Sequence, residues 1–261
     1  MHRFYLNRER IDGRRVDLPE EASRQAATVL RLRPGEQIAV FDGSGAEWLV
    51  RLDRVASAGT SGEIVDVRHP VVEPSIALTL CVAVLKADRF EFVLQRCTEA
   101  GVVRFQPFVS ERCVAEMPRG QKLGRWERLV REAAEQSGRV AVPALLPAVG
   151  LADLPRLAGT LPGIVLWEEE QSVSLREALG GLTISPGARS PTSGGPAIGT
   201  SSRSAFSLVI GPEGGLARPE VGRLAAAGMV VASLGPRVLR AETAALAATT
   251  AAMYHFGQLG R

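Results

Sequence analysis

Short apolar runs separated by turn residues characterise the chain from residue 1 to about residue 70. Runs of this kind, with Gly, Pro or Asp between them, are typical of β-strands. The predicted strands are 15–19, 36–43, 47–55 and 61–69. A short helix is expected between the first two, ending at Pro34-Gly35. Several strands in so short a region predict a small β-barrel over residues 1–70, followed by a linker between Pro70 and Pro74.

The pattern changes to alternating strands and helices from residue 75 onward. The run 75–85 is apolar throughout, as expected of a strand that is buried on both faces. In the next segment, 87–102, the apolar residues recur at helical spacing. Further elements are predicted as strands at 103–113, 162–169, 206–212 and 229–236, and as helices at 118–139 and from 242 onward. This alternation predicts an α/β domain over 74–261, with a mostly parallel sheet covered on both faces.

Composition excludes several classes of protein. No apolar run approaches the roughly 20 residues that span a bilayer, and the N-terminus lacks the apolar region of a secretion signal. Cys81, Cys97 and Cys113 show neither disulfide nor metal-ligand spacing, so we expect a cytoplasmic protein without a metal site or a membrane partner. The segment 185–204 is rich in Gly, Ser and Pro and is expected to be a mobile loop.

The charge of the chain does not by itself identify a partner, because the net charge is only +3. Of the 31 basic residues only Lys86 and Lys122 are lysines, which leaves 29 arginines. Arginine suits bidentate phosphate contacts and stacking on bases. A GC-rich genome that favours arginine codons explains the same composition more simply, so composition alone assigns no nucleic-acid partner.

A glycine-rich loop, Gly211-Pro-Glu-Gly-Gly, closes the apolar run at 206–212 and precedes a helix-like segment. A loop of the Walker A type requires a lysine followed by Ser or Thr, and this loop has neither. The dinucleotide fingerprint requires G-x-G-x-x-G, whereas the glycines here are Gly211, Gly214 and Gly215. Glu213 in the middle would also repel a phosphate. Both phosphate-binding interpretations are therefore excluded.

A second Gly-Pro loop, beginning at Gly235, follows the predicted strand at 229–236. Ligands in open α/β sheets bind at the carboxyl ends of the strands, and the two loops are expected to lie side by side there. Arg237, Arg240 and Glu242 add polar groups at the same place. These loops offer mainly backbone groups and few side chains that could bind a phosphate. Such a surface suits a neutral, adenosine-like ligand with an aliphatic tail.

The two loops together, LVIGPEGGL and LGPRVLRAETAAL, resemble the RsmE family of ribosomal RNA uridine-N3 methyltransferases, within the SPOUT (trefoil-knot) superfamily. Further matches occur in the family's order over nearly the whole chain: MHRFYL, VLRLRPGE, LKADRFEFVLQRCTEAGV, SERC, EAAEQSGR and FGQLG. Arg96 and Ala100 depart conservatively from the family's QKxTELG pattern, and the 185–204 segment is longer than usual.

The resemblance implies an N-terminal PUA-like β-barrel that binds RNA and a SPOUT α/β domain with a C-terminal trefoil knot. It implies S-adenosyl-methionine as the cofactor, bent and held between the knot loops. It also implies a homodimer in which each active site borrows from the other subunit. The product would be N3-methyluridine in the 16S ribosomal RNA of the small subunit.

The resemblance assigns cofactor binding to residues at the ends of three strands. They are Leu166, Trp167, Gly211, Gly214, Gly215, Leu234, Gly235 and Leu239. Backbone groups there would hold the adenine, and the side chains would pack against its faces. The simpler interpretations are a tight turn for the glycines and ordinary core packing for each leucine.

Arg240 and Glu242 are the candidate catalytic residues. The proton on N3 of uridine must leave before or during methyl transfer, so a carboxylate could accept it while a guanidinium stabilises the charge on O2 and O4. The alternative role for Glu242 is to stabilise a helix N-terminus. The alternative for Arg240 is an ion pair with Glu213 or with a carboxylate of the other subunit.

Six further arginines are candidates for contacts to RNA phosphates, because the substrate must be held electrostatically. They are Arg3, Arg8, Arg31 and Arg33 in the barrel and Arg112 and Arg139 in the second domain. A solvated charged face is the ordinary explanation for any one of them. Two alternative functions remain open: a SPOUT methyltransferase that acts on another RNA, and a non-catalytic RNA-binding module.

Overall fold

The computed structural model describes residues 1–115, 117, 120–158, 161–183 and 204–260. Nearly all of the predicted mobile loop at 185–204 therefore lies outside the described residues. The chain divides into two compact units. The first contains Met1–Glu73 together with Ala134–Val142, and the second contains the described residues of 74–133, 143–183 and 204–260.

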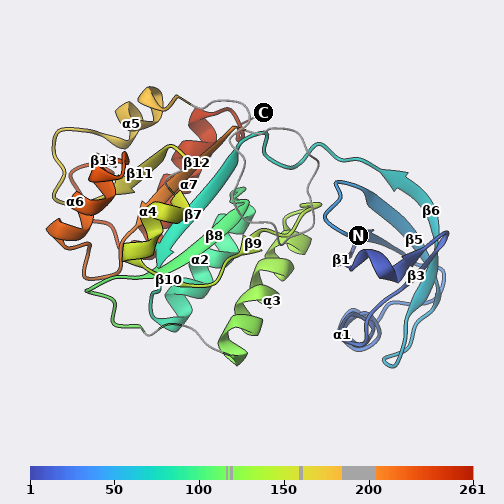
Figure 1. Cartoon of the computed structure of the whole chain (residues 1–261). Coiled ribbons are helices and arrows are strands. Elements are labelled where there is room, and N and C mark those ends of the chain that lie inside the picture. The colour runs from blue at the N-terminus through green and yellow to red at the C-terminus, as the bar shows by residue number, and fades with distance from the viewer. Residues whose placement is uncertain (116, 118–119, 159–160, 184–203, 261) are drawn as a thin grey trace. The chain divides into compact units, whose positions relative to one another are not determined.

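The first unit is built on one curled, six-stranded sheet (Figure 1). Its strands, in spatial order, are β1 (Arg3–Tyr5), β4 (Gln37–Phe41), β5 (Glu47–Arg54), β6 (Ser61–Arg68), β3 (Arg15–Asp17) and β2 (Ile11–Asp12). All four predicted strands are confirmed, and the predicted helix is α1 (Glu20–Arg24) continued by a π-turn over Gln25–Val29. Within residues 1–73, all of which are described, β1 and β2 do not pair. The predicted small β-barrel is thus a curled sheet whose two edge strands do not pair with each other.

A single apolar cluster fills the concave interior of this unit. It joins β1, β4 and β5 through the buried side chains of Phe4, Ile38 and Trp48. The Arg8 guanidinium lies over the Trp48 ring, 5.1 Å from its centroid. The members of the cluster on β4 and β5 recur at every second position, as expected when one face of each strand meets the cluster.

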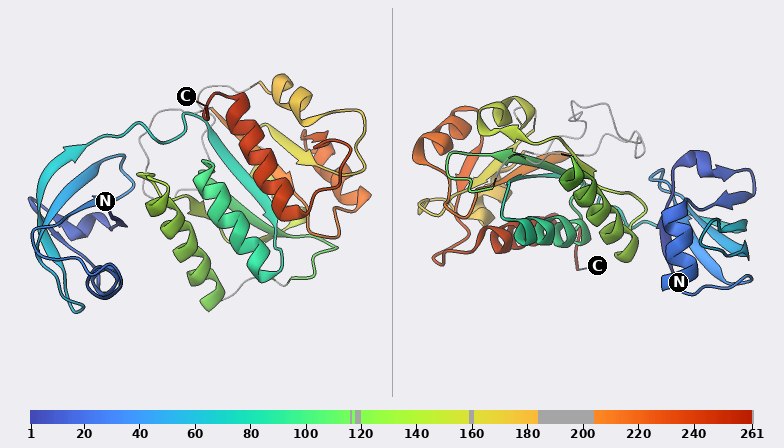
Figure 2. Two further views of the ribbon diagram at one scale, coloured as in Figure 1. Left: turned by 180° about the vertical axis from the view of Figure 1, so that it is seen from behind. Right: turned by 90° about the horizontal axis from the view of Figure 1, so that it is seen from below.

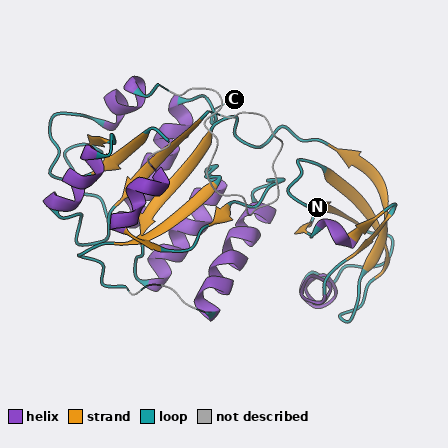
Figure 3. Ribbon diagram, in the orientation of Figure 1, coloured by secondary structure: helices purple, strands orange, loops and turns teal. Residues whose placement is uncertain are grey.

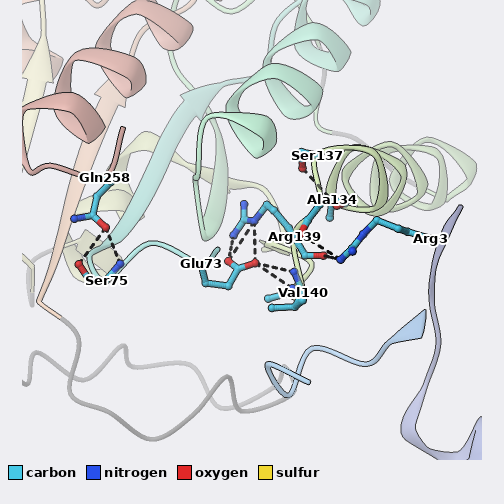
Figure 4. A network of polar contacts seen from close by, with 10 residues as sticks. Arg3, Glu73, Ser75, Ala134, Ser137, Arg139, Val140 and Gln258 are labelled. Carbon is cyan, nitrogen blue, oxygen red and sulfur yellow. Dashed lines mark hydrogen bonds and ion pairs between the residues drawn. The ribbon is translucent and has the colours of Figure 1, made fainter. Parts of the chain in front are cut away.

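A buried ion pair also belongs to the first unit (Figure 4). The Glu73 carboxylate accepts hydrogen bonds from Nε and Nη2 of Arg139, the latter at 2.7 Å. It also accepts the backbone N–H groups of Val140 and Ala141, both at 3.1 Å. Because the Arg139 and Glu73 side chains are only 5% and 7% exposed, four donors converge on one carboxylate that water hardly reaches.

The second unit is a parallel α/β structure (Figures 1 and 3). Its strands, in spatial order, are β10 (Val149–Gly150), β8 (Arg104–Val109), β7 (Ala77–Ala83), β12 (Ala205–Ile210), β11 (Gly163–Leu166) and β13 (Val230–Ala232), with β9 (Ala144–Leu145) also on β8. Every described pairing in this sheet is parallel. The prediction of a parallel sheet is confirmed, and β12 is buried along its whole length.

Helices cover both faces of this sheet, as Figure 2 shows. On one face α2 (Ala87–Glu99) lies beside α7 (Ala241–His255), and the other face carries α4 (Leu154–Ala158) and α6 (Arg218–Ala226). Phe90, Val93, Leu94 and Cys97, which recur at helical spacing in α2, are fully buried. The remaining helices are α3 (Gln121–Gln136) and α5 (Leu175–Gly181). The small buried alanines of α7 allow that helix to approach the sheet closely.

The three cysteines differ in their access to solvent and therefore in reactivity. Burial raises the pKa of the Cys81 and Cys97 thiols to about 12, whereas Cys113 is only half-buried. We expect iodoacetamide at pH 8 to alkylate Cys113 in the native protein and to leave the other two unmodified, because the thiolate is the reactive form. Peptide mass spectrometry, with the urea-unfolded chain as the control, checks this. Rapid alkylation of Cys97 before unfolding would contradict it.

Candidate functional site

A cavity of about 780 Å³ lies in the second unit, at the carboxyl ends of three neighbouring strands. Its walls come from the segments that follow β11, β12 and β13 and from the N-terminus of α7. The two Gly-Pro loops open at the same edge of the sheet, as predicted. They are not direct neighbours, because β11 pairs with both β12 and β13 and separates them. The sequence spacing of the loops could not show this, since it does not contain the strand order.

Most of the predicted ligand-binding residues line this cavity. They are Leu166, Trp167, Gly211, Gly215, Leu234, Gly235, Leu239 and Arg240. Gly214 and Glu242 do not line it. Gly214 instead turns toward Arg112, whose Nη1 donates to the Gly214 carbonyl at 3.1 Å.

The glycine loop is a tight turn that packs against its own chain. The amide of Gly215 donates to the Pro212 carbonyl at 2.9 Å, and Gly215 has a φ of +71°, which disfavours residues with a Cβ. A Cβ on Gly211 would lie 2.9 Å from Cγ of the buried Leu216 and 3.2 Å from its backbone nitrogen. The turn and its close packing against Leu216 therefore require glycine at these positions.

Trp167 joins the end of β11 to the glycine loop. Its side chain is 9% exposed, and its indole Nε1 donates to the Leu216 carbonyl at 3.2 Å. The Arg218 guanidinium lies 5.1 Å from the centroid of the tryptophan ring and forms a 2.6 Å ion pair with Glu169. These contacts hold one wall of the cavity in a fixed position relative to the next.

A third wall, residues 170–174, was not singled out from the sequence. The Glu170 carboxylate accepts the backbone N–H groups of Ser172 and Val173, at 2.6 and 3.2 Å, which lowers its pKa. The amide of Ser233, at the end of β13, donates to the Val173 carbonyl at 2.8 Å. Ser174 then caps α5 in a capping box with Glu177. That S-x-x-E spacing is a signal visible in the sequence.

Charged side chains meet at the inner side of the cavity. Nη1 of Arg89, a cavity residue of the matched segment LKADRFEFVLQRCTEAGV that was not singled out from the sequence, lies 3.4 Å from Oε1 of Glu213. Nε of Arg89 lies 3.9 Å from Oε1 of Glu242, which is in the first turn of α7. Arg240 is exposed and forms no ion pair in the described part of the chain. The ion pair considered between Arg240 and Glu213 is therefore absent from the structure, because Glu213 is paired with Arg89.

The six candidate RNA-binding arginines fall into two groups. Arg8, Arg31, Arg33 and Arg112 are exposed. Arg139 is buried and paired with Glu73, and Arg3 is engaged by Glu47 and by the carbonyls of Gly138 and Arg139. The structure thus contradicts a direct phosphate contact for Arg139, and the paired guanidinium of Arg3 is poorly placed for one.

Among the described residues, no group of three or more His, Cys, Asp or Glu side chains could hold a metal ion. No helix in the same part of the chain is long and apolar enough to cross a membrane.

Comparison with known proteins identifies the family to which this chain belongs. An RNA methyltransferase domain model matches residues 72–253, and an RNA methyltransferase PUA domain model matches residues 18–55. Ribosomal RNA small subunit methyltransferase E of Mycobacterium bovis is 35% identical, over 85% of this chain and 80% of its own length. The chain belongs to the RsmE family of RNA methyltransferases. The resemblance seen in the loops is confirmed.

Two other members of the RsmE family agree with this assignment. The protein from Synechocystis is 31% identical over 93% of this chain and 74% of its own length. The crystal structure of the protein from Neisseria gonorrhoeae, bound to S-adenosyl methionine, superimposes with a TM-score of 0.82 at 31% identity. That comparison covers 97% of both chains, so the similarity includes both units.

Proposed function

We propose that this protein transfers a methyl group from S-adenosyl-methionine to N3 of a uridine in 16S ribosomal RNA. The observation that carries the proposal is the cavity at the carboxyl ends of β11, β12 and β13. Its wall includes Arg240, whose guanidinium forms no ion pair with any of the described residues. Membership of the RsmE family supports the class of reaction.

The residues of the cavity fit such a cofactor. Its volume lies within the roughly 300–1,000 Å³ typical of small-molecule sites. Leu166, Leu234 and Leu239 offer apolar surface to an adenine ring, and the glycines at 211, 215 and 235 allow its close approach to backbone groups. The cofactor supplies an electrophilic methyl group when it is bound.

The polar side chains of Arg240 and Glu242 have different roles in this proposal. Arg240 would stabilise the negative charge that develops on O2 and O4 of the uracil as N3 loses its proton. Glu242 lies behind the cavity wall beside Arg89, so we propose that it supports the N-terminus of α7 and does not itself take the proton. The favourable position of a carboxylate in the first turn of a helix agrees with that role.

The proposal also covers the two domains, the knot, the oligomeric state, the substrate particle and the location of the protein. Residues 1–70 would form the PUA-like RNA-binding domain and 74–261 the SPOUT domain, with Arg8, Arg31, Arg33 and Arg112 facing RNA phosphates. The C-terminal trefoil knot remains a prediction that rests on the resemblance. A homodimer and the small subunit as the substrate are proposed on the same basis, and a cytoplasmic location is proposed on the cysteine usage.

Replacing Gly211 with alanine is expected to weaken cofactor binding on the order of 10-fold or more. The new Cβ would meet the Leu216 side chain, which is 1% exposed and cannot move aside. Overpacking of this kind costs about 1–3 kcal/mol, and about 1.4 kcal/mol corresponds to tenfold in affinity. Calorimetry with S-adenosyl-methionine measures the effect. Gly222→Ala is the matched control, since its Cβ would meet nothing within 4 Å; equal affinity in both variants would contradict the prediction.

The decisive experiment is methylation of isolated small subunits and of naked 16S RNA, followed by mass mapping of the modified nucleoside. We expect a single N3-methyluridine. Methylation of a carbon or of a ribose hydroxyl would overturn the uridine-N3 proposal, and methylation of transfer RNA instead would favour another SPOUT activity. Absence of both methylation and cofactor binding would favour a non-catalytic RNA-binding module.

A further inference from the structure

Arg89 links two walls of the cavity through its side chain. It lies in the first turn of α2, and its guanidinium faces the cavity while remaining 35% exposed. Two carboxylates from different elements approach it: Glu213 from the glycine loop at 3.4 Å, and Glu242 from the first turn of α7 at 3.9 Å. One cation is thus shared between the glycine loop and the helix that follows the second Gly-Pro loop.

The contact with Glu213 fixes the glycine loop on α2. Oε1 of Glu213 also accepts the backbone N–H of Lys86, the N-cap residue of α2, at 3.3 Å. The positive end of the helix and the guanidinium of Arg89 therefore act on the same carboxylate oxygen. The Glu213 side chain is only 20% exposed, so water screens these attractions less than it would on the surface.

Glu242 has fewer other polar partners than Glu213 in the described part of the chain. Glu242 is 14% exposed, and its Oε2 is buried without a hydrogen-bond partner in the described part of the chain. Arg89 is the one cation that the structure places within ion-pair distance of Glu242 among the described residues. Without Arg89, two partly buried carboxylates would face each other with no counter-charge and would repel.

We infer that Arg89 is a positioning residue for methyl transfer, an inference that rests on the proposed function. By holding Glu213 it sets the glycine loop, and by holding Glu242 it sets the first turn of α7. Arg240 is the N-cap residue of that helix, two positions before Glu242. Arg89 therefore orients Arg240 through the chain, and Arg240 keeps its own donors free for the uracil.

The test compares Arg89→Ala and Arg89→Lys with Arg96→Ala as the matched control. Arg96 is on the same helix, is 51% exposed and pairs only with its helical neighbour Glu99 in the interactions described for it. At saturating S-adenosyl-methionine and RNA, we expect Arg89→Ala to lower the single-turnover rate about 100-fold, since small misplacements of reacting groups cost that much. The lysine variant should recover part of the rate, because it keeps the charge but not the planar fork. Arg96→Ala should match the wild type.

Two further measurements separate positioning from folding and from RNA contact. RNA affinity, measured by filter binding, should be unchanged in Arg89→Ala. The double variant Arg89→Ala/Glu213→Gln should have nearly the same single-turnover rate as Arg89→Ala alone, because both changes remove the same contact. A normal rate at saturation, or a loss confined to RNA affinity, would overturn the inference. An inactive wild type would refute the proposed function instead. Calorimetry with S-adenosyl-methionine then tests whether Arg89 sets the glycine loop: we expect weaker binding in Arg89→Ala, and an affinity equal to that of the wild type would overturn the inference.

Discussion

Replacing Glu73 with alanine is expected to lower the free energy of unfolding of the first unit by about 3–5 kcal/mol. The reason is that the substitution would leave the former partners of the Glu73 carboxylate buried. Arg139 would remain 5% exposed without the Glu73 carboxylate, and the amides of Val140 and Ala141 would lose their acceptor. Urea unfolding, followed by hydrogen exchange of the amides of the first unit, measures the loss.

Two further variants identify the cause of that loss. Glu63→Ala removes one partner of the Arg51 ion pair, whose side chains are 56% and 47% exposed, and should cost at most about 1 kcal/mol. Glu73→Gln keeps an oxygen for the two amides and removes the charge, so its cost should lie between those of the two alanine variants. A Glu73→Ala protein as stable as Glu63→Ala would show that the buried pair contributes nothing.

The periodicity of apolar residues was enough to predict the main elements of both units. Strands such as β7 and β12 are buried on both faces, so their sequences are almost entirely apolar and easily recognised. The helical spacing in α2 predicted its buried face for the same reason. Short elements escaped prediction: β2 and β10 have two residues each, too few to show any period.

The contents of the site could be predicted only in part, because adjacency depends on strand order. The motif residues at the ends of β11, β12 and β13 do meet around one cavity. The separation of the two Gly-Pro loops by β11 is a property of topology, which no local pattern contains. Arg139 illustrates the same limit, because nothing in its local sequence indicates that its side chain is buried in an ion pair with Glu73, which is distant in the sequence.

Replacing Arg240 with alanine is the functional change with the largest expected effect. A preorganised cation that meets developing charge in a site sheltered from water typically contributes about 100- to 1,000-fold to the rate. The Arg240 guanidinium is free of internal ion pairs in the described structure. Its removal should therefore cost little stability, and the whole loss should appear in transfer to RNA.

The measurement is the single-turnover rate of methyl transfer to small subunits at saturating cofactor, with cofactor affinity measured separately by calorimetry. We expect Arg240→Ala to lose about 100- to 1,000-fold in rate while it binds S-adenosyl-methionine as the wild type does. Arg223→Ala, an exposed arginine on α6 that does not line the cavity, is the matched control. If Arg240→Ala transferred methyl groups as fast as Arg223→Ala, the cation that stabilises the uracil would have to come from elsewhere, and Arg237, the other arginine of the same loop, would be the next residue to replace.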